Sequence, residues 1–410
     1  MPLKIKKQIY DNVHGYIGLT DTELRIIDTP VFQRLRHIKQ LGPVYLVYPG
    51  ATHTRFSHSI GTMFMMDLFL KNAVKSEVSE DDTQKLRLAA LLHDIGHYPF
   101  SHTLERYIES NLDGASHEDF GTAIIRDMLS DKLENFNAEE ITRIISGKGK
   151  KEFGMLLSST LDADKSDYLL RDSYNTGVPY GRIGIMSMLR IINFEKDRIV
   201  FEKDESPIEN FIIGRYHLYK ALVYHKTVVG FDVLLQTVFG FLVEEGYIAD
   251  PNSLSTEEEI LRYTDDTVMV AMHEYLSKGA SEQRKKMVMM FLARKPPRLV
   301  YSLTRLGPGG RIPKEIATVE RMVYDKTFKE EFAEKSGADP ESVLPSVMNE
   351  LKFLEDSTNI YIRKKDGTVP LEKGNSIILN MLMGKTVYDA RIYCAGNSLN
   401  RMTEAFLKMV

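Results

Sequence analysis

The chain has 410 residues, a formal net charge of −4 and a single cysteine, Cys394. Its basic residues are dispersed, so the charge pattern gives no footprint for duplex nucleic acid or an anionic membrane. One cysteine excludes an internal disulfide framework and a thiolate zinc cluster.

The N-terminus and the apolar segments predict a soluble cytoplasmic protein. Met1-Pro2-Leu3-Lys4 is not followed by a long apolar segment, so no signal peptide is expected. The most apolar run, Val233–Val243, is interrupted by Gln236 and Thr237 and is too short to cross a bilayer. We therefore expect no membrane partner.

The first half of the chain reads as a short hairpin followed by helices. Lys4–Tyr10 and Gly15–Leu19 are typical of paired strands. Asp28-Thr29-Pro30 predicts the start of a helix over Val31–Gln40, which Gly42-Pro43 ends. Further helices are predicted over His58–Ser76, Lys85–Ile95, Phe120–Ser130, Ala138–Ser146, Thr160–Tyr174 and Ile208–Val243.

After about residue 250 the pattern becomes mixed. Helices are predicted to continue to about Leu354, and Ile360–Arg363 then starts a hairpin that turns at Asp366-Gly367. Ile377–Leu382 and Val387–Tyr393 are typical of strands, and a closing helix follows. The prediction is a mostly α protein, with a helical core over residues 1–250 and a smaller α+β C-terminal lobe over residues 251–410.

The segment Leu91–His102 carries the chemistry. Its sequence LLHDIGHYPFSH places His93 and Asp94 at the buried end of a leucine-rich helix. Leaving these polar groups unpaired in an apolar interior costs a few kcal/mol or more. A divalent transition metal is a fitting partner for imidazole and carboxylate groups.

Other predicted helices supply further ligands of the same kind. His58 lies on one of them, and Asp162, Asp164 and Asp167 lie on another, so a helical core can gather them around His93 and Asp94. Spacing alone does not choose among the three carboxylates. The alternative is that these groups are capped or salt-bridged residues of a helical bundle.

Three stretches together resemble the HD superfamily of metal-dependent phosphohydrolases, and within it the deoxynucleoside triphosphate triphosphohydrolases. They are QRLRHIKQLG at 33–42, YPGATHTRFSH at 48–58 and HDIGHYPFSH at 93–102, and the match extends over roughly residues 7–240. The resemblance implies a divalent ion (Mn, Fe, Zn, Ni or Mg) held by His58, His93, Asp94 and Asp164.

Histidines beside the metal are suited to proton transfer, because imidazole titrates near neutrality. His97 lies one turn after His93 and shares its face if the helix persists. Glu118 follows His117 in the chain and is a candidate for orienting it. The resemblance places His97, His102, His117 and Glu118 around the phosphate chain, with His102 as our preferred general acid. The remaining histidines, such as His14 and His53, are expected to have surface or local hydrogen-bonding roles.

Cations on the neighbouring helices favour a triphosphate, since a polyphosphate needs several positive partners. The alternative for each is a solvated helix face. By resemblance the substrate-binding residues are Gln40, Leu41, Arg55, Lys165, Tyr168, Asp172, Arg215, His225 and Lys226. One departure affects base preference: the family pattern has tyrosine at the Val223 position, whereas here the tyrosine is Tyr224.

The resemblance also implies regulation. Members of the family bind a guanine nucleotide, dGTP or GTP, between subunits of a tetramer, and the corresponding residues here are Lys7, Asp28, Gln33 and Arg36. A carboxylate accepts from the guanine N1 and N2 donors, and arginine donates to O6 or N7. The alternative is that Asp28 caps the helix beginning at Pro30.

The sequence thus predicts an allosteric homotetramer that hydrolyses dNTPs to deoxynucleoside and inorganic triphosphate. Another HD phosphodiesterase or nucleotidase, or a nucleotide-sensing regulatory protein, are the alternatives. A nucleic-acid partner is disfavoured by the acidic balance and by the absence of a basic, aromatic-rich stretch.

Overall fold

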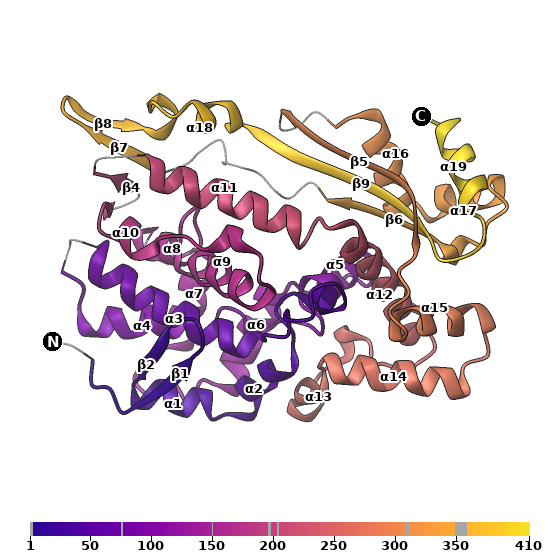
Figure 1. Ribbon diagram of the computed structural model, residues 1–410. Helices are drawn as coiled ribbons and strands as arrows, with labels where there is room; N and C mark the ends of the chain where they lie inside the picture. The colour runs from indigo at the N-terminus through magenta and orange to yellow at the C-terminus, as the bar shows by residue number, and fades with distance from the viewer. Residues whose placement is uncertain are drawn as a thin grey trace.

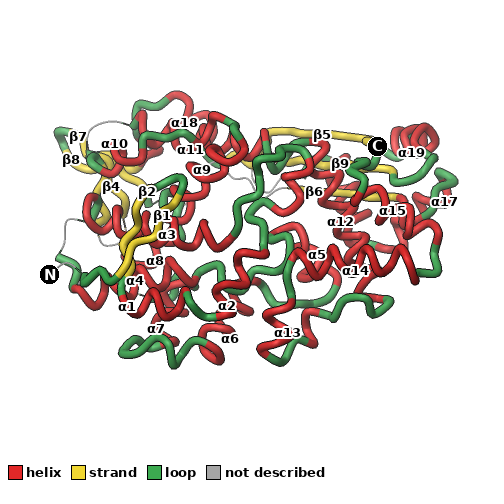
Figure 2. Tube along the Cα trace, turned by 60° about the horizontal axis from the view of Figure 1, so that its bottom comes forward, coloured by secondary structure: helices red, strands yellow, loops and turns green. Residues whose placement is uncertain are grey.

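Helices form most of the molecule, and its strands gather at two ends (Figures 1 and 2). The computed structural model describes residues 3–74, 77–149, 151–195, 198–202, 205–308, 312–348 and 359–410. The predicted fold class, mostly α with a smaller α+β C-terminal part, is confirmed.

The chain begins with the predicted hairpin. Strands β1 (Lys7–Asp11) and β2 (Gly15–Leu19) pair antiparallel. Helix α1 (Asp21–Ile27) follows, and a capping box stabilises its N-terminus. The helix predicted from Pro30 is shorter than expected: α2 (Pro30–Gln33) passes into the 3-10 helix η1 (Arg34–His37). It ends early because the next residues pair with another segment, with Lys39 bridged to Thr54.

The middle of the chain contains the long helices that surround the site. Helix α3 packs against α4 and α9, and α12 packs against α5 and α15. The single helix predicted over residues 208–243 is two helices, because His225 caps the second one by accepting from the Thr227 N–H at 3.2 Å. The elements are η2 (Gly42–Leu46), α3 (Arg55–Asn72), α4 (Glu80–Leu92), α5 (His102–Asn111), α6 (His117–Met128), α7 (Ala138–Ile145), α8 (Lys151–Leu157), α9 (Ala163–Thr176), η3 (Pro179–Gly181), α10 (Ile185–Leu189), α11 (Ser206–Ala221) and α12 (Lys226–Glu244).

Helix α12 is, by length and composition alone, long and apolar enough to cross a membrane, which the shorter run Val233–Val243 did not predict. In the structure 61% of its most apolar window is buried. Its apolar side chains belong to the main core, as in the central helix of a folded domain.

The C-terminal part contributes to two small sheets, one of which it shares with β3 and β4 from the first part of the chain. Strands β5, β9 and β6 form an antiparallel sheet in that order, and β3, β4, β7 and β8 form a mixed one. The elements are β3 (Ile192–Glu195), β4 (Arg198–Phe201), η4 (Pro251–Ser253), α13 (Glu257–Arg262), α14 (Asp265–Lys278), α15 (Glu282–Leu292), β5 (Arg298–Pro308), α16 (Lys314–Tyr324), α17 (Lys326–Lys335), η5 (Pro340–Ser342), β6 (Val343–Met348), β7 (Ile360–Lys364), β8 (Gly367–Pro370), η6 (Leu371–Lys373), α18 (Ile377–Leu382), β9 (Lys385–Cys394) and α19 (Leu399–Leu407).

Two predictions for this part were wrong, and three are confirmed, among them the closing helix, which is α19. Residues 298–308 and 343–348 are strands where helices were expected, and the end of that prediction, residues 349–354, lies outside the described residues. Ile377–Leu382 is helix α18, because Ser376 caps it by accepting from the Leu379 N–H at 3.0 Å. The Asp-Gly hairpin β7–β8 and strand β9 are as predicted.

The main hydrophobic core does not stop at residue 250. It continues through α14 and α15 and includes buried side chains as far along the chain as Tyr393. A second core lies between the β5–β9–β6 sheet and helices α16, α17 and α19. The division into residues 1–250 and 251–410 therefore stays a prediction. Helix α14 packs in the same core as the helices that form the site.

A buried ion network ties the N-terminal hairpin to α9. Arg171 is fully buried and donates to Asp11 of β1 at 2.8 Å and to Asp167 at 2.9 Å. An added Cβ at Gly61 of α3 would lie 2.0 Å from Asp167 Oδ1, so only glycine accommodates this close approach. Because both carboxylates are buried, Arg171 is their main source of compensating charge.

Replacing Arg171 with methionine is expected to lower the free energy of unfolding by about 3–5 kcal/mol, because it leaves two buried carboxylates without their cation. Arg25→Met is the matched control, since Arg25 pairs with Asp21 at the surface and its loss is expected to cost less than about 1 kcal/mol. Urea denaturation measures both. Equal effects of the two substitutions would contradict a structural role for this network.

Candidate metal centre and active site

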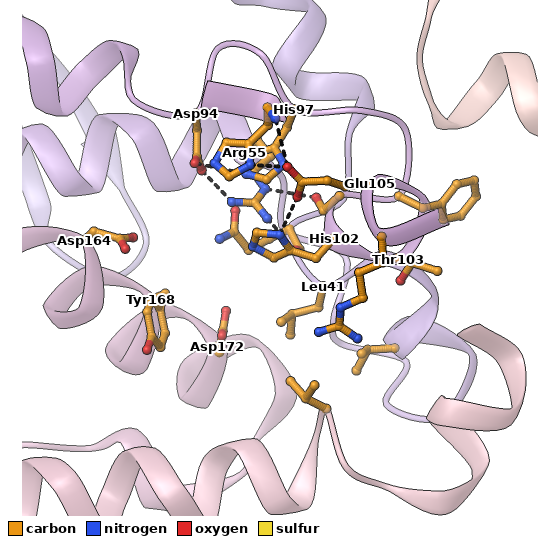
Figure 3. Close-up of a pocket in the computed structure, with 18 of the residues that line it drawn as sticks. Leu41, Arg55, Asp94, His97, His102, Thr103, Glu105, Asp164, Tyr168 and Asp172 are labelled. Carbon is orange, nitrogen blue, oxygen red and sulfur yellow. Dashed lines mark hydrogen bonds and ion pairs between the residues drawn. The ribbon is translucent and has the colours of Figure 1, made fainter. Parts of the chain in front are cut away.

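A cavity of about 650 Å³ opens between the helical elements (Figure 3). It brings together side chains from α3, from the loop between α4 and α5, and from α9 and α11. Lining residues include Gln40, Leu41, Arg55, His93, Asp94, His97, Ser101, His102, Glu105, His117, Glu118, Asp164, Lys165, Tyr168, Asp172, Arg215 and Tyr219.

His58, His93 and Asp164 converge at one end of this cavity. His58 Nε2 lies 3.0 Å from Asp164 Oδ1, and His93 Nε2 lies 3.7 Å from the same oxygen. Asp94 completes the group, with its oxygens 3.6 Å from His58 Nε2 and 3.3 Å from His93 Nε2. His58, His93 and Asp164 thus lie close enough together to hold one ion, and Asp94 lies beside the two imidazole rings.

The other two carboxylates of the 162–167 segment have different partners. Asp162 caps α9 and accepts from Lys165 Nζ at 2.9 Å. Asp167 bonds to Arg171 and, at 2.7 Å, to Nδ1 of His58. Asp164 is therefore the carboxylate of this segment that faces the two imidazole rings.

The ring nitrogens that face the centre fit a metal. Nε2 of His58 and Nε2 of His93 are buried and make no hydrogen bond within the described part of the chain. Their other nitrogens are fixed, since His58 Nδ1 bonds to Asp167 and His93 Nδ1 bonds to the Ala90 carbonyl at 2.8 Å. Such outer bonds orient the ring and leave Nε2 free for an ion.

The charge balance supports a bound cation. Burial disfavours a charged imidazole, but the carboxylates of Asp164 and Asp167 outweigh it and raise the pKa of His58 to about 10. Burial would raise the pKa of Asp94, but Arg55 and the neighbouring imidazoles hold it well below its usual range. A site this negative favours a positive occupant, and a metal ion replaces the proton on His58.

A second group, His97, His102, Glu105 and His117, lies beside the first. Glu105 accepts from His102 Nδ1 at 2.7 Å and makes a short contact with His117 Nδ1. The rings of His97 and His117 are stacked with centroids 4.0 Å apart. His97 Nε2 in turn lies 3.2 Å from Asp94 Oδ1, which joins the two groups.

Two predictions about this group need correction. The carboxylate that contacts His117 is Glu105, whereas Glu118 is exposed at the cavity. Helix α4 ends at Leu92, so His97 does not share a helical face with His93 and reaches Asp94 through the turn that follows. The spacing His102-x-x-Glu105 places both side chains on one helix face, so the sequence contains a signal that could have predicted this pair.

The histidines of this group differ in the direction of their pKa shifts. Burial, Arg55 and His117 hold the pKa of His97 well below its usual range. Burial also opposes a charge on His117, but its bond to Glu105 outweighs this and raises its pKa. Burial would raise the pKa of Glu105, yet the imidazoles around it hold that pKa far below the usual range. The result is a neutral ring beside Asp94 and an ionised pair farther out.

Most predicted substrate residues line the cavity, and two do not. Gln40, Leu41, Arg55, Lys165, Tyr168, Asp172 and Arg215 line it, whereas His225 and Lys226 lie outside its lining. Val223, just before these two residues, lies at the cavity. Tyr224 is buried, and its carbonyl accepts a hydrogen bond from Arg391 at 2.6 Å.

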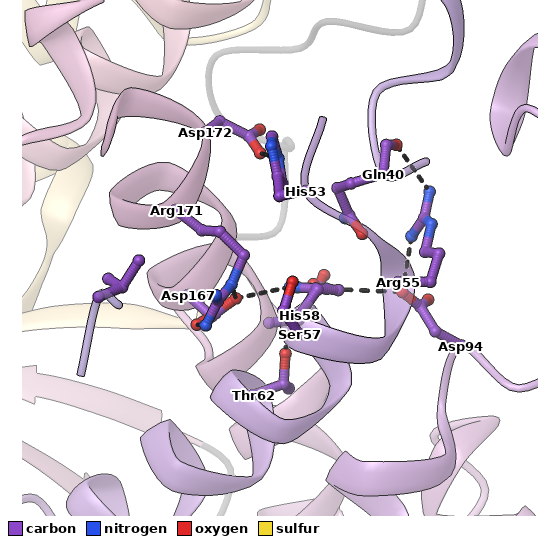
Figure 4. A network of polar contacts seen from close by, with 12 residues as sticks. Gln40, His53, Arg55, Ser57, His58, Thr62, Asp94, Asp167, Arg171 and Asp172 are labelled. Atoms are coloured by element: carbon purple, nitrogen blue, oxygen red, sulfur yellow. Dashed lines mark hydrogen bonds and ion pairs between the residues drawn. The ribbon is translucent and has the colours of Figure 1, made fainter. Parts of the chain in front are cut away.

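Two histidines have larger roles than expected. His14 bonds to Asp167, and His53 bonds to Asp172 at 2.8 Å, so both hold α9 from distant segments (Figure 4 shows the second bond). Their partners lie more than a hundred residues away in the sequence, so no local sequence pattern predicts these contacts.

The four predicted regulatory residues lie on β1, at the end of α1, and on α2 and η1. Asp28 follows α1 as its C-cap, and Thr29, not Asp28, caps α2 by accepting from the Phe32 N–H. Arg36 lies 3.5 Å from the centre of the Phe56 ring and donates to Gln33 Oε1 at 2.6 Å. Lys7 is exposed on β1.

Comparisons with known proteins agree with this geometry. Residues 55–172 match the HD domain model. The chain is 43% identical over 238 residues to the uncharacterised protein MJ1154 of Methanocaldococcus jannaschii, covering 56% of this chain and 48% of that protein. It is 31% identical over 284 residues to the deoxynucleoside triphosphate triphosphohydrolase SAMHD1 homolog of Dictyostelium discoideum, covering 64% of this chain and 54% of that protein.

The chain contains an HD domain and is similar, over part of its length, to proteins named as dNTP triphosphohydrolases. This confirms the resemblance found in its motifs. It spans about half the length of the curated relatives it matches. A hypothetical protein from Aquifex aeolicus has the same fold, with a TM-score of 0.76, 26% identity and coverage of 97% of this chain and 99% of that one.

Replacing Asp164 with alanine is expected to remove most of the divalent metal that co-purifies with the protein, since one of four ligands is lost. Glu118→Ala is the matched control, a cavity carboxylate outside the metal group, and is expected to keep its metal. Elemental analysis measures both. Full metal content in the Asp164 variant would remove this carboxylate from the site.

The Glu105–His117 pair predicts a pH-dependent stability. The depressed pKa of Glu105 gives a contribution that is lost as pH falls below the usual carboxylate range, and the raised pKa of His117 gives one that is lost as pH rises through it. Glu105→Gln is thus expected to lower the free energy of unfolding by about 2 kcal/mol near pH 6, and by less at pH 9. Urea denaturation across pH measures this, with Glu118→Gln as the control. A difference that is constant with pH would contradict the pairing.

Proposed function

We propose that this protein hydrolyses dNTPs to deoxynucleoside and inorganic triphosphate. The observation that carries the proposal is one cavity in which a His/Asp metal group, a His–Glu group and several cations lie together. The relatives named as dNTP triphosphohydrolases support the same substrate class.

The metal group would hold the ion that the reaction needs. His58, His93, Asp94 and Asp164 would bind a divalent ion, which would polarise a phosphoryl oxygen and lower the pKa of water. Arg55 donates to Asp94 Oδ2 at 2.6 Å and lies at the edge of the same cavity. It therefore has the position to hold both a ligand carboxylate and a phosphate oxygen.

His102 is suited to protonate the leaving group. Its Nδ1 bonds to Glu105, which leaves Nε2 toward the cavity, and its side chain is 56% exposed. In the proposed step water adds to the α-phosphorus, the bond from phosphorus to O5′ breaks, and O5′ takes the proton from His102. The proton that the added water loses then returns His102 to its charged form. Glu105 orients the ring, and its bond to His102 offsets part of the burial that lowers the pKa of this histidine.

The remaining lining residues divide between phosphate and sugar. Lys165 and Arg215 are the cations on α9 and α11 that face the cavity, and two cations suit the charge of a triphosphate tail. Tyr168 and Asp172 lie one and two turns along α9 from Asp164, and Gln40 and Leu41 face them. We propose that these four residues form the binding site for the sugar.

A guanine nucleotide is the proposed activator, bound by Lys7, Asp28, Gln33 and Arg36 in a homotetramer. Supporting this, Thr29 caps α2, so the carboxylate of Asp28 is exposed and is not used as the cap of that helix. Arg36 and Gln33 are held together by a hydrogen bond, which presents a donor and an amide from one short segment.

Incubation of the protein with each dNTP and Mn²⁺ is expected to release triphosphate in one step, as followed by phosphorus NMR. Arg215→Ala is expected to raise KM about 10–100-fold, the range for a hydrogen bond to a charged group. Lys226→Ala, outside the cavity, is the matched control with KM within about 3-fold. Stepwise release of orthophosphate, or turnover of a cyclic dinucleotide instead, would favour another HD hydrolase; binding of dNTP without turnover would favour a nucleotide sensor.

Hydrolysis of dATP is expected to increase when dGTP or GTP is added, together with a shift toward a tetramer in light scattering. Asp28→Ala is expected to abolish both effects, because the guanine N1 and N2 donors lose their acceptor. Activity independent of guanine nucleotide in a monomeric protein would reject the regulatory site and leave the catalytic proposal in place.

A further inference from the structure

Two consecutive residues before helix α5 have backbone angles that side chains rarely adopt. Phe100 has φ of 54° and Ser101 has φ of 53°, the latter with ψ of −136°. Both are in the left-handed half of backbone space, and the Ser101 combination is one in which glycine is normally found. A serine at this position is therefore held against a local preference.

The surroundings maintain this conformation from both sides. The Phe100 N–H donates to Asp265 Oδ1 at 2.6 Å, and Asp265 Oδ2 accepts from the Lys39 N–H at 3.0 Å. The Phe100 ring is fully buried. Asp265 belongs to α14, so the region after residue 250 helps to fix the loop that carries the HD motif.

The hydroxyl of Ser101 lies between two parts of the site. It donates to the Lys39 carbonyl at 2.8 Å and accepts from Arg55 Nε at 2.9 Å. Arg55 then donates through Nη1 to Asp94 Oδ2 at 2.6 Å (Figure 4). Another contact of this guanidinium, Nη2 to the Gln40 carbonyl, is long at 3.5 Å.

We propose that Ser101 is a positioning residue, whose hydroxyl fixes the Arg55 guanidinium and, through it, the carboxylate of Asp94. This inference rests on the proposed metal-dependent function. A bond at Nε sets the plane of the guanidinium, and that plane decides where Nη1 meets Asp94. In this conformation the hydroxyl reaches both Lys39 and Arg55, and these two bonds offset the backbone strain at Ser101.

Two substitutions distinguish the effect of the Ser101 hydroxyl from the effect of its backbone strain. Ser101→Gly removes the hydroxyl and relieves the strain, whereas Ser101→Ala removes the hydroxyl and keeps the strain. If the hydroxyl is what matters, both variants bind Mn²⁺ about 10-fold more weakly than the wild type, as loss of an outer partner of a metal ligand does. The glycine variant should nevertheless melt roughly 2–4 °C above the alanine variant.

Mn²⁺ affinity is measured on the full chain by electron paramagnetic resonance, and melting on the metal-free protein. Ser336→Ala is the matched control, because Ser336 is a buried serine in the second core, and its Mn²⁺ affinity should equal that of the wild type. Wild-type affinity in Ser101→Gly, with loss only in Ser101→Ala, would overturn the proposal, since a purely structural serine is replaced well by glycine. Equal melting of the two variants would also overturn it.

The same titration distinguishes this inference from the proposed reaction. A wild type that binds Mn²⁺ but releases no triphosphate from any dNTP would reject the reaction, while the comparison of the Ser101 variants still decides the role of the hydroxyl. A wild type that binds no Mn²⁺ would overturn both.

Discussion

The bond between Asp167 and His58 is the interaction on which the rest of the site depends. Asp167 Oδ2 fixes Nδ1 of His58 at 2.7 Å, and this leaves Nε2 directed at Asp164 and Asp94. Asp167 is itself fully buried, so it needs compensating partners, and Arg171 and His14 provide them. The N-terminal hairpin, α3 and α9 are thereby joined around one ligand.

The same arrangement explains why a catalytic cavity is compatible with a stable fold. Several carboxylates and imidazoles lie within a few ångströms of one another at low exposure, which is unfavourable unless each charge has a partner. Arg55 and Arg171 supply fixed positive charge on two sides of the group, at Asp94 and at Asp167. A divalent ion is the remaining partner that the geometry and the charge call for.

The local sequence predicted those features that depend on neighbours in the chain. The hairpin β1–β2, the Asp-Gly turn of β7–β8 and the helices α3, α4, α6, α7 and α9 follow from apolar periodicity and turn residues, and the HD run identified the metal group. Strands β5 and β6 were missed because their burial is irregular and their pairing with β9 joins segments far apart. Glu105 was missed although its spacing from His102 was readable, whereas Asp11, His14 and Asp265 act across distances that no local pattern carries.

The account stands most directly on where the metal binds, because the structure offers two neighbouring groups of potential ligands. Crystals soaked in Mn²⁺ and measured at the manganese absorption edge would locate it by anomalous scattering. The account predicts the strongest peak between His58 Nε2, His93 Nε2 and Asp164. A strongest peak among His97, His102, Glu105 and His117, or none in the cavity, would contradict it.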